Sequence, residues 1–134
     1  MDQHVVNELV QKFIAFLETG TAPDGLFAPD IFLDFTMPTW RVQSQGTAQA
    51  VALRKRGHPA PGKVARYRLD LIPAGFVLEL EERWTDAGQN WYCREMFRAD
   101  VRDGLITELS VYCTGDWDAA RQAQHQTAVK LIRP

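Results

Sequence analysis

The sequence has little cysteine, no excess of one charge and no long apolar run. Its 2 cysteines show no CxxC spacing, which argues against a disulfide framework or a zinc-binding fold. The net charge of -2, from 15 basic and 17 acidic residues, provides no field that would attract nucleic acid. No stretch approaches the ~20 apolar residues of a transmembrane helix, and no signal-peptide pattern opens the chain. We therefore expect a soluble, cytoplasmic protein with neither a nucleic-acid nor a membrane partner.

The sequence also lacks the short motifs that hold metals, phosphates or serine nucleophiles. Its 3 histidines are isolated, and none belongs to an HxH or HExxH spacing. Phosphate-binding glycine loops and serine-nucleophile patterns are missing as well. We therefore expect no metal and no organic cofactor. His58 stands out among the histidines because it lies at the end of a predicted helix.

The first half of the chain alternates helical and extended patterns. Apolar residues recur every three or four positions from Val6 to Leu17, which predicts an amphipathic helix that Asp2 caps and Gly20 ends. Residues 30–37 alternate as a strand that stops before a proline. A loop and a short helix over residues 47–57 are expected to follow.

The second half is mostly sheet. Alternation with period two runs from Lys63 to Thr114, interrupted by turn residues in three places, and predicts four consecutive antiparallel strands. A final helix is expected to begin near Asp116, and Trp117 is expected to pack it onto the sheet. Together with the first half, this order predicts a single α+β domain over residues 1–134.

This order of elements resembles the nuclear transport factor 2-like superfamily, which includes SnoaL-like polyketide cyclases, ketosteroid isomerase and limonene epoxide hydrolase. The resemblance covers the whole chain and is carried by the amphipathic segment Val6–Leu17, the stretch Phe27–Asp34, the loop Pro38–Gly46 and the segment Arg102–Ile106. It implies a cone-shaped, curved antiparallel sheet, a cystatin-like α+β barrel, wrapped around the first helix. It also implies a cavity in the cone and a homodimer formed through the outer face of the sheet.

Two carboxylates lie on apolar faces of the predicted strands. A tight hairpin at residues 86–89 pairs Trp84 with Trp91 and places Glu82 opposite Cys93, which makes Glu82 and Glu95 diagonal neighbours about 5 to 8 Å apart. Two carboxyls so close cannot both ionise easily, so one can act as an acid while the other acts as a base. Glu95 is the preferred catalytic candidate. Glu82 lies closer to the turn and has a structural alternative, a rim position or a pair with an arginine.

The predicted position of two further catalytic candidates depends on geometry that alternation leaves open. A simple hairpin at residues 103–104 places Tyr112 opposite Glu95, where the phenol could donate to the carboxylate. A one-residue bulge instead turns Tyr112 and Glu108 outward and Cys113 inward. Asp34 is a possible partner of Glu95, but its strand has apolar residues on both faces, so its direction stays undetermined.

Aromatic and apolar side chains are the candidates for substrate contacts. Beside ketosteroid isomerase, Phe13 falls at the tyrosine that holds the oxyanion and Phe35 at the aspartate base, so that enzyme's catalytic groups are missing here. The seven candidates for the cavity wall are Phe13, Phe35, Trp40, Tyr67, Trp84, Trp91 and Phe97.

These features favour a cofactor-independent acid/base enzyme, of the isomerase, cyclase, dehydratase or epoxide-opening type, acting on a small, largely apolar molecule. A non-catalytic module that binds a hydrophobic ligand or mediates dimerisation is the alternative.

Overall fold

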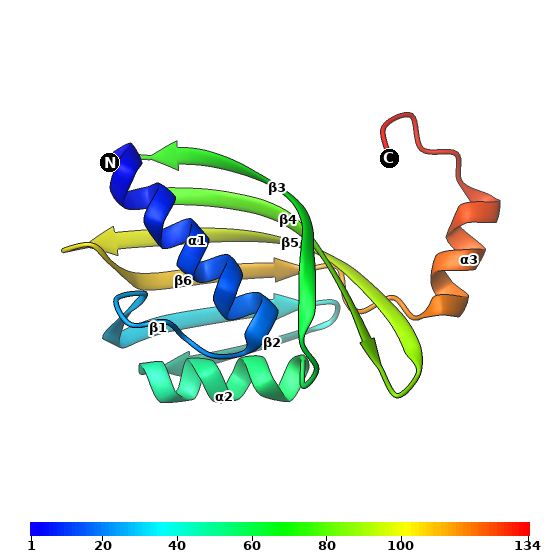
Figure 1. The fold of residues 1–134 in the computed structure, drawn as a ribbon, viewed down its shortest axis with the longest axis horizontal. Helices are drawn as coiled ribbons and strands as arrows, with labels where there is room; N and C mark the ends of the chain where they lie inside the picture. Colours follow the sequence, from blue (N-terminus) through cyan, green and yellow to red (C-terminus); the bar gives the residue numbers. More distant parts are fainter.

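The computed structural model describes residues 1–134 as three helices and a six-stranded sheet (Figure 1). The strands follow the order β2-β1-β6-β5-β4-β3 across the sheet. The elements are α1 (Gln3–Thr19), β1 (Phe27–Met37), β2 (Trp40–Gln45), α2 (Thr47–Gly57), β3 (Gly62–Ile72), β4 (Gly75–Asp86), β5 (Gln89–Arg102), β6 (Leu105–Cys113) and α3 (Ala119–Ala128).

Helix α1 lies across the concave face of the curved sheet, as Figure 1 shows. The Asp2 carboxylate accepts hydrogen bonds from two backbone N–H groups of the first turn, and Gly20 ends the helix in the left-handed conformation with φ 77°. The predicted caps are therefore confirmed. The apolar stripe of α1 is buried against the sheet, where Phe13 meets Phe97 edge to face at 4.8 Å between ring centroids. The α+β architecture with a sheet curved around α1 is confirmed.

The sheet is mixed and open, whereas we expected an antiparallel barrel. Strand β1 pairs with β6 in parallel, and every other neighbouring pair is antiparallel. The expectation was wrong for this pair because β1 and β6 are joined by a long connection through five other elements, which leaves either direction open. Strands β2 and β3 form the two free edges.

Residues 40–45 form an edge strand, β2, where the sequence predicted a loop. The chain turns through Pro38 and Thr39, and Thr39 adopts φ 59° between the paired residues Met37 and Trp40. The strand was missed because it is short and mostly exposed, so it carries little apolar alternation.

The β4–β5 hairpin has the predicted register, with Trp84 opposite Trp91, Glu82 opposite Cys93 and Leu80 opposite Glu95. The β5–β6 hairpin does not follow the simple prediction. A bulge after Asp100 shifts the pairing by one residue. As a consequence Cys113 lies opposite Glu95, and Tyr112 lies opposite Met96 on the outer face.

The last helix stands at the far end of the long β4–β5 hairpin, away from α1 and α2 (Figure 1). It begins at Ala119 with Asp118 as its N-cap, slightly later than predicted. Trp117 precedes it and bonds through its backbone to Tyr92 of β5, with the two rings 5.4 Å apart. No helix of this structure has the length and apolar character needed to cross a membrane.

Candidate functional site

A cavity of about 620 Å³ opens between α1, α2 and the concave face of the sheet. Of its 24 lining residues 16 are hydrophobic, so a ligand inside would be surrounded mainly by apolar surface. Most of the polar lining residues gather toward one end of the cavity and belong to α2, β5, the end of β6 and the segments that follow α2 and β6. They are Arg54, His58, Glu95, Cys113 and Asp116, and Arg56 of α2 also lines the cavity.

Glu95 is the buried acid of this cavity. Its residue is only 3% exposed, and it projects from β5 beside the apolar side chain of Phe97. Burial raises the pKa of Glu95 well above its ordinary value, and the neighbouring negative charge of Glu82 raises it further. Glu95 is therefore the protonated member of the pair and can donate a hydrogen bond.

Glu82 is the ionised member and lies behind Glu95, outside the cavity lining. It is 2% exposed, and Arg54 of α2 donates to both of its carboxylate oxygens, at 2.5 and 3.1 Å. Burial acts to raise the pKa of Glu82, but the hydrogen bond with Glu95 and the charge of Arg54 outweigh it and hold this pKa below its ordinary value. This geometry accounts for the predicted division into one carboxyl with a raised pKa and one with a lowered pKa.

Arg54 is fixed from a second side as well. The nitrogen Nη2 also donates to the carbonyl oxygen of Leu17, at 2.7 Å, near the end of α1. The guanidinium therefore ties α1, α2 and β4 together beneath the cavity. No local pattern marks this role, because Arg54 belongs to a run of basic residues in the last turn of α2, where cations are ordinarily favoured by the helix dipole.

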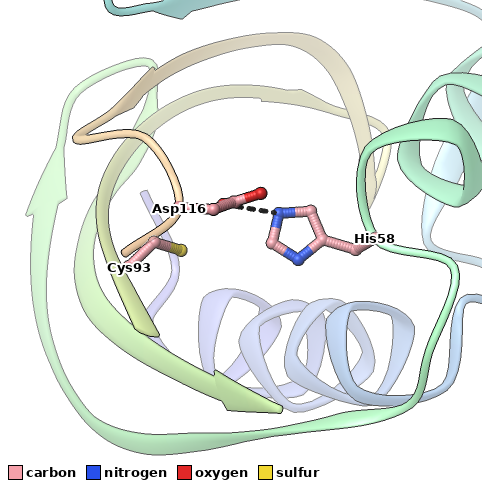
Figure 2. A group of neighbouring side chains, drawn as sticks. All are labelled: His58, Cys93 and Asp116. Atoms are coloured by element: carbon pink, nitrogen blue, oxygen red, sulfur yellow. Dashed lines mark ion pairs between the residues drawn. The ribbon is translucent and has the colours of Figure 1, made fainter. Parts of the chain in front are cut away.

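His58 and Asp116 form a second polar pair, shown in Figure 2. The nitrogen Nε2 of His58 lies 3.7 Å from Oδ1 of Asp116, and the imidazole packs on the Trp84 ring at 4.4 Å between centroids. Burial and the charge of Arg54 lower the pKa of His58 to about 4, so the ring is neutral at pH 7. Burial raises the pKa of Asp116, followed by the charge of Glu82.

The two cysteine thiols join these pairs into one cluster. Cys93 is fully buried, and its sulfur donates toward Oε1 of Glu95 over 3.6 Å. In Figure 2 the Cys93 sulfur points toward the His58–Asp116 pair. Cys113 lies at the end of β6, and its sulfur accepts a hydrogen bond from the Gly115 N–H at 3.4 Å.

Two sets of side chains in this cluster could supply donors to a metal ion. The donor atoms of His58, Cys93 and Asp116 lie within 4.8 Å of one another, and so do those of Cys93, Glu95 and Cys113. Both sets share Cys93, which would have to lose its proton to bind a metal. The neighbouring Cys113 thiol and burial raise the pKa of Cys93, and this opposes metal binding.

Four of the seven aromatic and apolar candidates line the cavity, namely Phe13, Phe35, Trp40 and Phe97. Trp40 lies on the rim and keeps 67% of its surface exposed. The other three were misplaced. Tyr67 is 47% exposed and accepts a hydrogen bond from Gln11 of α1, while Trp84 and Trp91 stack outside the cavity, near the β4–β5 turn. They were misplaced because alternation identifies a face of the sheet but not the distance along it.

Two catalytic candidates point away from the cavity. Tyr112 is 61% exposed on the outer face, so of the two predicted registers the bulged one is confirmed and the simple hairpin, in which Tyr112 meets Glu95, is wrong. Asp34 shares that outer face and binds Arg41 of β2 through two hydrogen bonds, at 2.8 and 2.5 Å. Asp34 is therefore not a partner of Glu95 in this structure.

Solved structures share this architecture at low sequence identity. An NTF2-like protein from Anabaena variabilis has a TM-score of 0.71 at 18% identity, over 84% of this chain and 89% of its own. The fold is that of the NTF2-like proteins. A LEH-like epoxide hydrolase of M. tuberculosis gives 0.64 at 16% identity, over 82% and 83%. A provisionally named polyketide cyclase from Xanthomonas campestris gives 0.62 at 20%, over 82% and 90%. No protein-family model and no curated protein matches the chain.

Two residues of the polar cluster, Arg54 and Asp116, were not predicted as site residues from the sequence. An arginine in a helical basic run and an aspartate just before a helix both have ordinary local explanations, so neither carried a signal. His58 was singled out by its position after α2, and it does line the cavity.

The arrangement can move protons inside an apolar enclosure. Glu95 supplies a neutral carboxylic acid, while Asp116 and the neutral His58 supply proton acceptors at the same polar end. General acid and general base catalysis require one group that donates a proton and another that accepts one, both placed around the same cavity.

Proposed function

We propose that the protein is a cofactor-independent enzyme that performs acid/base chemistry on a small, largely apolar molecule held in this cavity. The observation that carries the proposal is Glu95, a carboxyl buried to 3% exposure at the polar end of an otherwise apolar cavity. A carboxyl in such surroundings costs free energy unless it is neutral or paired, and Glu95 is held neutral by its environment.

In this proposal Glu95 donates its proton or a hydrogen bond to an oxygen of the substrate. That oxygen can belong to a carbonyl, a hydroxyl or an epoxide, since each gains a negative charge when its bond is polarised or opened. Glu82 and Arg54 hold the Glu95 carboxyl in place from behind. Asp116, oriented by His58, accepts the proton that the substrate loses.

The apolar wall sets the kind of substrate. Phe13, Phe35 and Phe97 contact its carbon skeleton, and Trp40 covers the mouth once the ligand is bound. Exclusion of water by these side chains strengthens the hydrogen bond that Glu95 gives. The names of the similar solved structures, which include an epoxide hydrolase and a polyketide cyclase, are in keeping with chemistry of this kind in an NTF2-like cavity.

Hydrogen–deuterium exchange provides a test that needs no knowledge of the natural substrate. 2-Tetralone, a small apolar ketone, is incubated with the protein in D₂O, and exchange at its α-carbon is followed by NMR. Glu95→Gln should slow the protein-dependent exchange about a hundredfold. Glu108→Gln, which changes an exposed carboxylate on the outer face of β6, is the matched control and should leave the rate unchanged.

A non-catalytic binding module is the rival, because the cavity is apolar enough to hold a ligand without reacting with it. If 2-tetralone binds to the wild-type protein and neither exchanges its protons nor depends on Glu95, the enzymatic proposal is wrong and the binding module is favoured.

We also propose that the protein forms a homodimer through the outer face of the sheet. This face exposes Met96 at 44% and Tyr112 at 61%, next to the ion pair between Arg94 and Glu79. Large apolar side chains among charged residues are typical of a polar dimer interface. Sedimentation equilibrium should give a dimer mass for the wild type and a monomer mass for Met96→Glu; a wild-type monomer at all concentrations would contradict the proposal.

A further inference from the structure

Cys113 is the cysteine whose thiol group belongs to the cavity wall. The bulge in the β5–β6 hairpin places it on the inner face opposite Glu95, whereas Cys93 lies behind the wall and is fully buried. A ligand of the cavity therefore meets the sulfur of Cys113 and is separated from that of Cys93.

The surroundings of Cys113 favour its thiolate. The neighbouring Cys93 thiol, within 4.8 Å of the Cys113 sulfur, lowers the pKa of Cys113; burial opposes this effect, and the Gly115 N–H, which donates to that sulfur, adds to it. Gly115 adopts φ 83°, a conformation that a glycine reaches without strain and that turns the chain sharply after β6. Asp116 and Glu82 oppose the thiolate with their negative charges, but the net direction is toward a lower pKa.

A neutral acid lies beside this sulfur. The donor atoms of Cys113, Cys93 and Glu95 all lie within 4.8 Å of one another. Glu95 holds a proton, and Cys113 is the thiol with the lower pKa. A nucleophile and a proton donor on the same wall of an apolar cavity match the needs of an addition to a polarised double bond.

We propose that Cys113 adds covalently to small apolar α,β-unsaturated carbonyl compounds that enter the cavity. The electron pair of the thiolate forms a bond to the β-carbon, and the electrons of the carbon–carbon double bond move toward the carbonyl to give an enolate. Glu95 then gives its proton to the enolate and later regains one from water. Electrons and protons balance without an oxidant or a reductant, and the reverse steps release the compound.

This proposal shares the proton of Glu95 with the proposed function, but adds a covalent bond that acid/base chemistry does not need. The probe is benzalacetone, an apolar enone, with its saturated counterpart 4-phenyl-2-butanone as a ligand of the same shape that cannot react. Intact-mass spectrometry and peptide mapping should find one benzalacetone adduct, on Cys113, and 4-phenyl-2-butanone should slow its formation. Cys113→Ser should form no adduct.

Variants of the neighbouring residues test the mechanism. Glu95→Gln should slow the addition of benzalacetone about a hundredfold, because the enolate loses its proton donor. Alkylation of Cys113 by iodoacetamide needs no added proton and should change little in the same variant. Cys93→Ala should slow both reactions, and Cys93→Ser, which keeps a hydroxyl donor, should restore much of the rate.

The proposal is overturned if the adduct forms on Cys93 or on another side chain, or if Cys113 reacts with benzalacetone no faster than glutathione does. Should Cys113→Ser fold poorly, protection of the wild type by 4-phenyl-2-butanone still decides whether reaction occurs in the cavity. The two proposals fail separately. If Cys113→Ser keeps Glu95-dependent exchange and the wild type forms no adduct, covalent addition is wrong and acid/base chemistry stands; the opposite pattern rejects only the proposed function.

Discussion

Arg54 of α2 donates two hydrogen bonds, at 2.5 and 3.1 Å, to the Glu82 carboxylate of β4, directly behind the Glu95 carboxyl. Both partners are buried, with side chains 11% and 2% exposed. A buried ion pair of this kind contributes little net stability compared with apolar residues, but removal of one partner leaves an uncompensated charge in the interior. Arg54 therefore determines both the stability of the site and the charge that Glu95 experiences.

Arg54→Met should destabilise the protein by about 3 to 5 kcal/mol, because Glu82 would stay buried without its partner. The free energy of unfolding in urea at pH 7 measures the change. The double variant Arg54→Met/Glu82→Leu removes both charges and should recover most of the lost stability. Equal destabilisation by the single and the double variant would show that packing of the arginine, and not its charge, is what matters.

The raised pKa of Glu95 predicts a loss of stability as the pH rises. Below the ordinary value of 4.5 both folded and unfolded states hold the proton. Above it the unfolded state releases the proton while the folded state keeps it, so unfolding becomes progressively easier until the folded pKa is passed. Glu95→Gln cannot ionise and should lack this decline.

The measurement is the difference in unfolding free energy between Glu95→Gln and wild type, taken from pH 4 to pH 9. We expect this difference to grow with pH in favour of the variant. A constant difference over the whole range would mean that Glu95 titrates near its ordinary pKa and that the proposed acid is absent.

Much of the fold follows from the alternation of apolar and polar residues and from the turn residues that interrupt it. The turn after Asp86 and the two apolar faces that flank it determine the β4–β5 register, and with it the proximity of Glu82 and Glu95. The site was harder to predict because its other members come from distant segments. Arg54 reaches Glu82 across 28 positions, and no local pattern marks that contact.

The bulge after Asp100 shows that a local sequence pattern can also leave the register of a strand pair undetermined. The Asp103–Gly104 turn was recognised, but one unpaired residue further along exchanges inner and outer faces for the rest of β6. Alternation alone is compatible with both registers. The choice depends on packing of Leu109 and Val111 into the core, which only the folded sheet decides.

Tyr112→Phe tests this register directly. Because the phenol is exposed on the outer face and forms no hydrogen bond with Glu95, loss of its hydroxyl should change stability by less than about 0.5 kcal/mol. The Glu95 pKa, followed by carboxyl NMR, should also stay in place. A marked shift of that pKa in Tyr112→Phe would place the phenol in the cavity and contradict the bulged register.

Trp40 should contribute to ligand binding despite its exposure, because it lies on the cavity rim and is free to pack on a bound molecule. Trp40→Ala should weaken the binding of 2-tetralone about tenfold, as measured by calorimetry. Trp40→Phe retains an aromatic ring and should lose much less. Unchanged affinity in Trp40→Ala would show that the rim plays no part in covering the ligand.

His58 predicts a second pH effect, of opposite sign, at acidic pH. Arg54, Glu82 and Asp116 are the charged groups around it, and burial with the Arg54 charge lowers the pKa of His58 from 6.5 to about 4. Between pH 6.5 and about pH 4 the histidine is protonated in the unfolded state but neutral in the folded state, so stability falls as the pH drops. At pH 5 the loss should reach about 2 kcal/mol.

His58→Gln removes the titrating group and should flatten the stability curve between pH 7 and pH 5 relative to wild type. Urea unfolding at closely spaced pH values measures this. If His58→Gln keeps the full acid loss, the pKa of His58 is not lowered on folding and another group causes the loss.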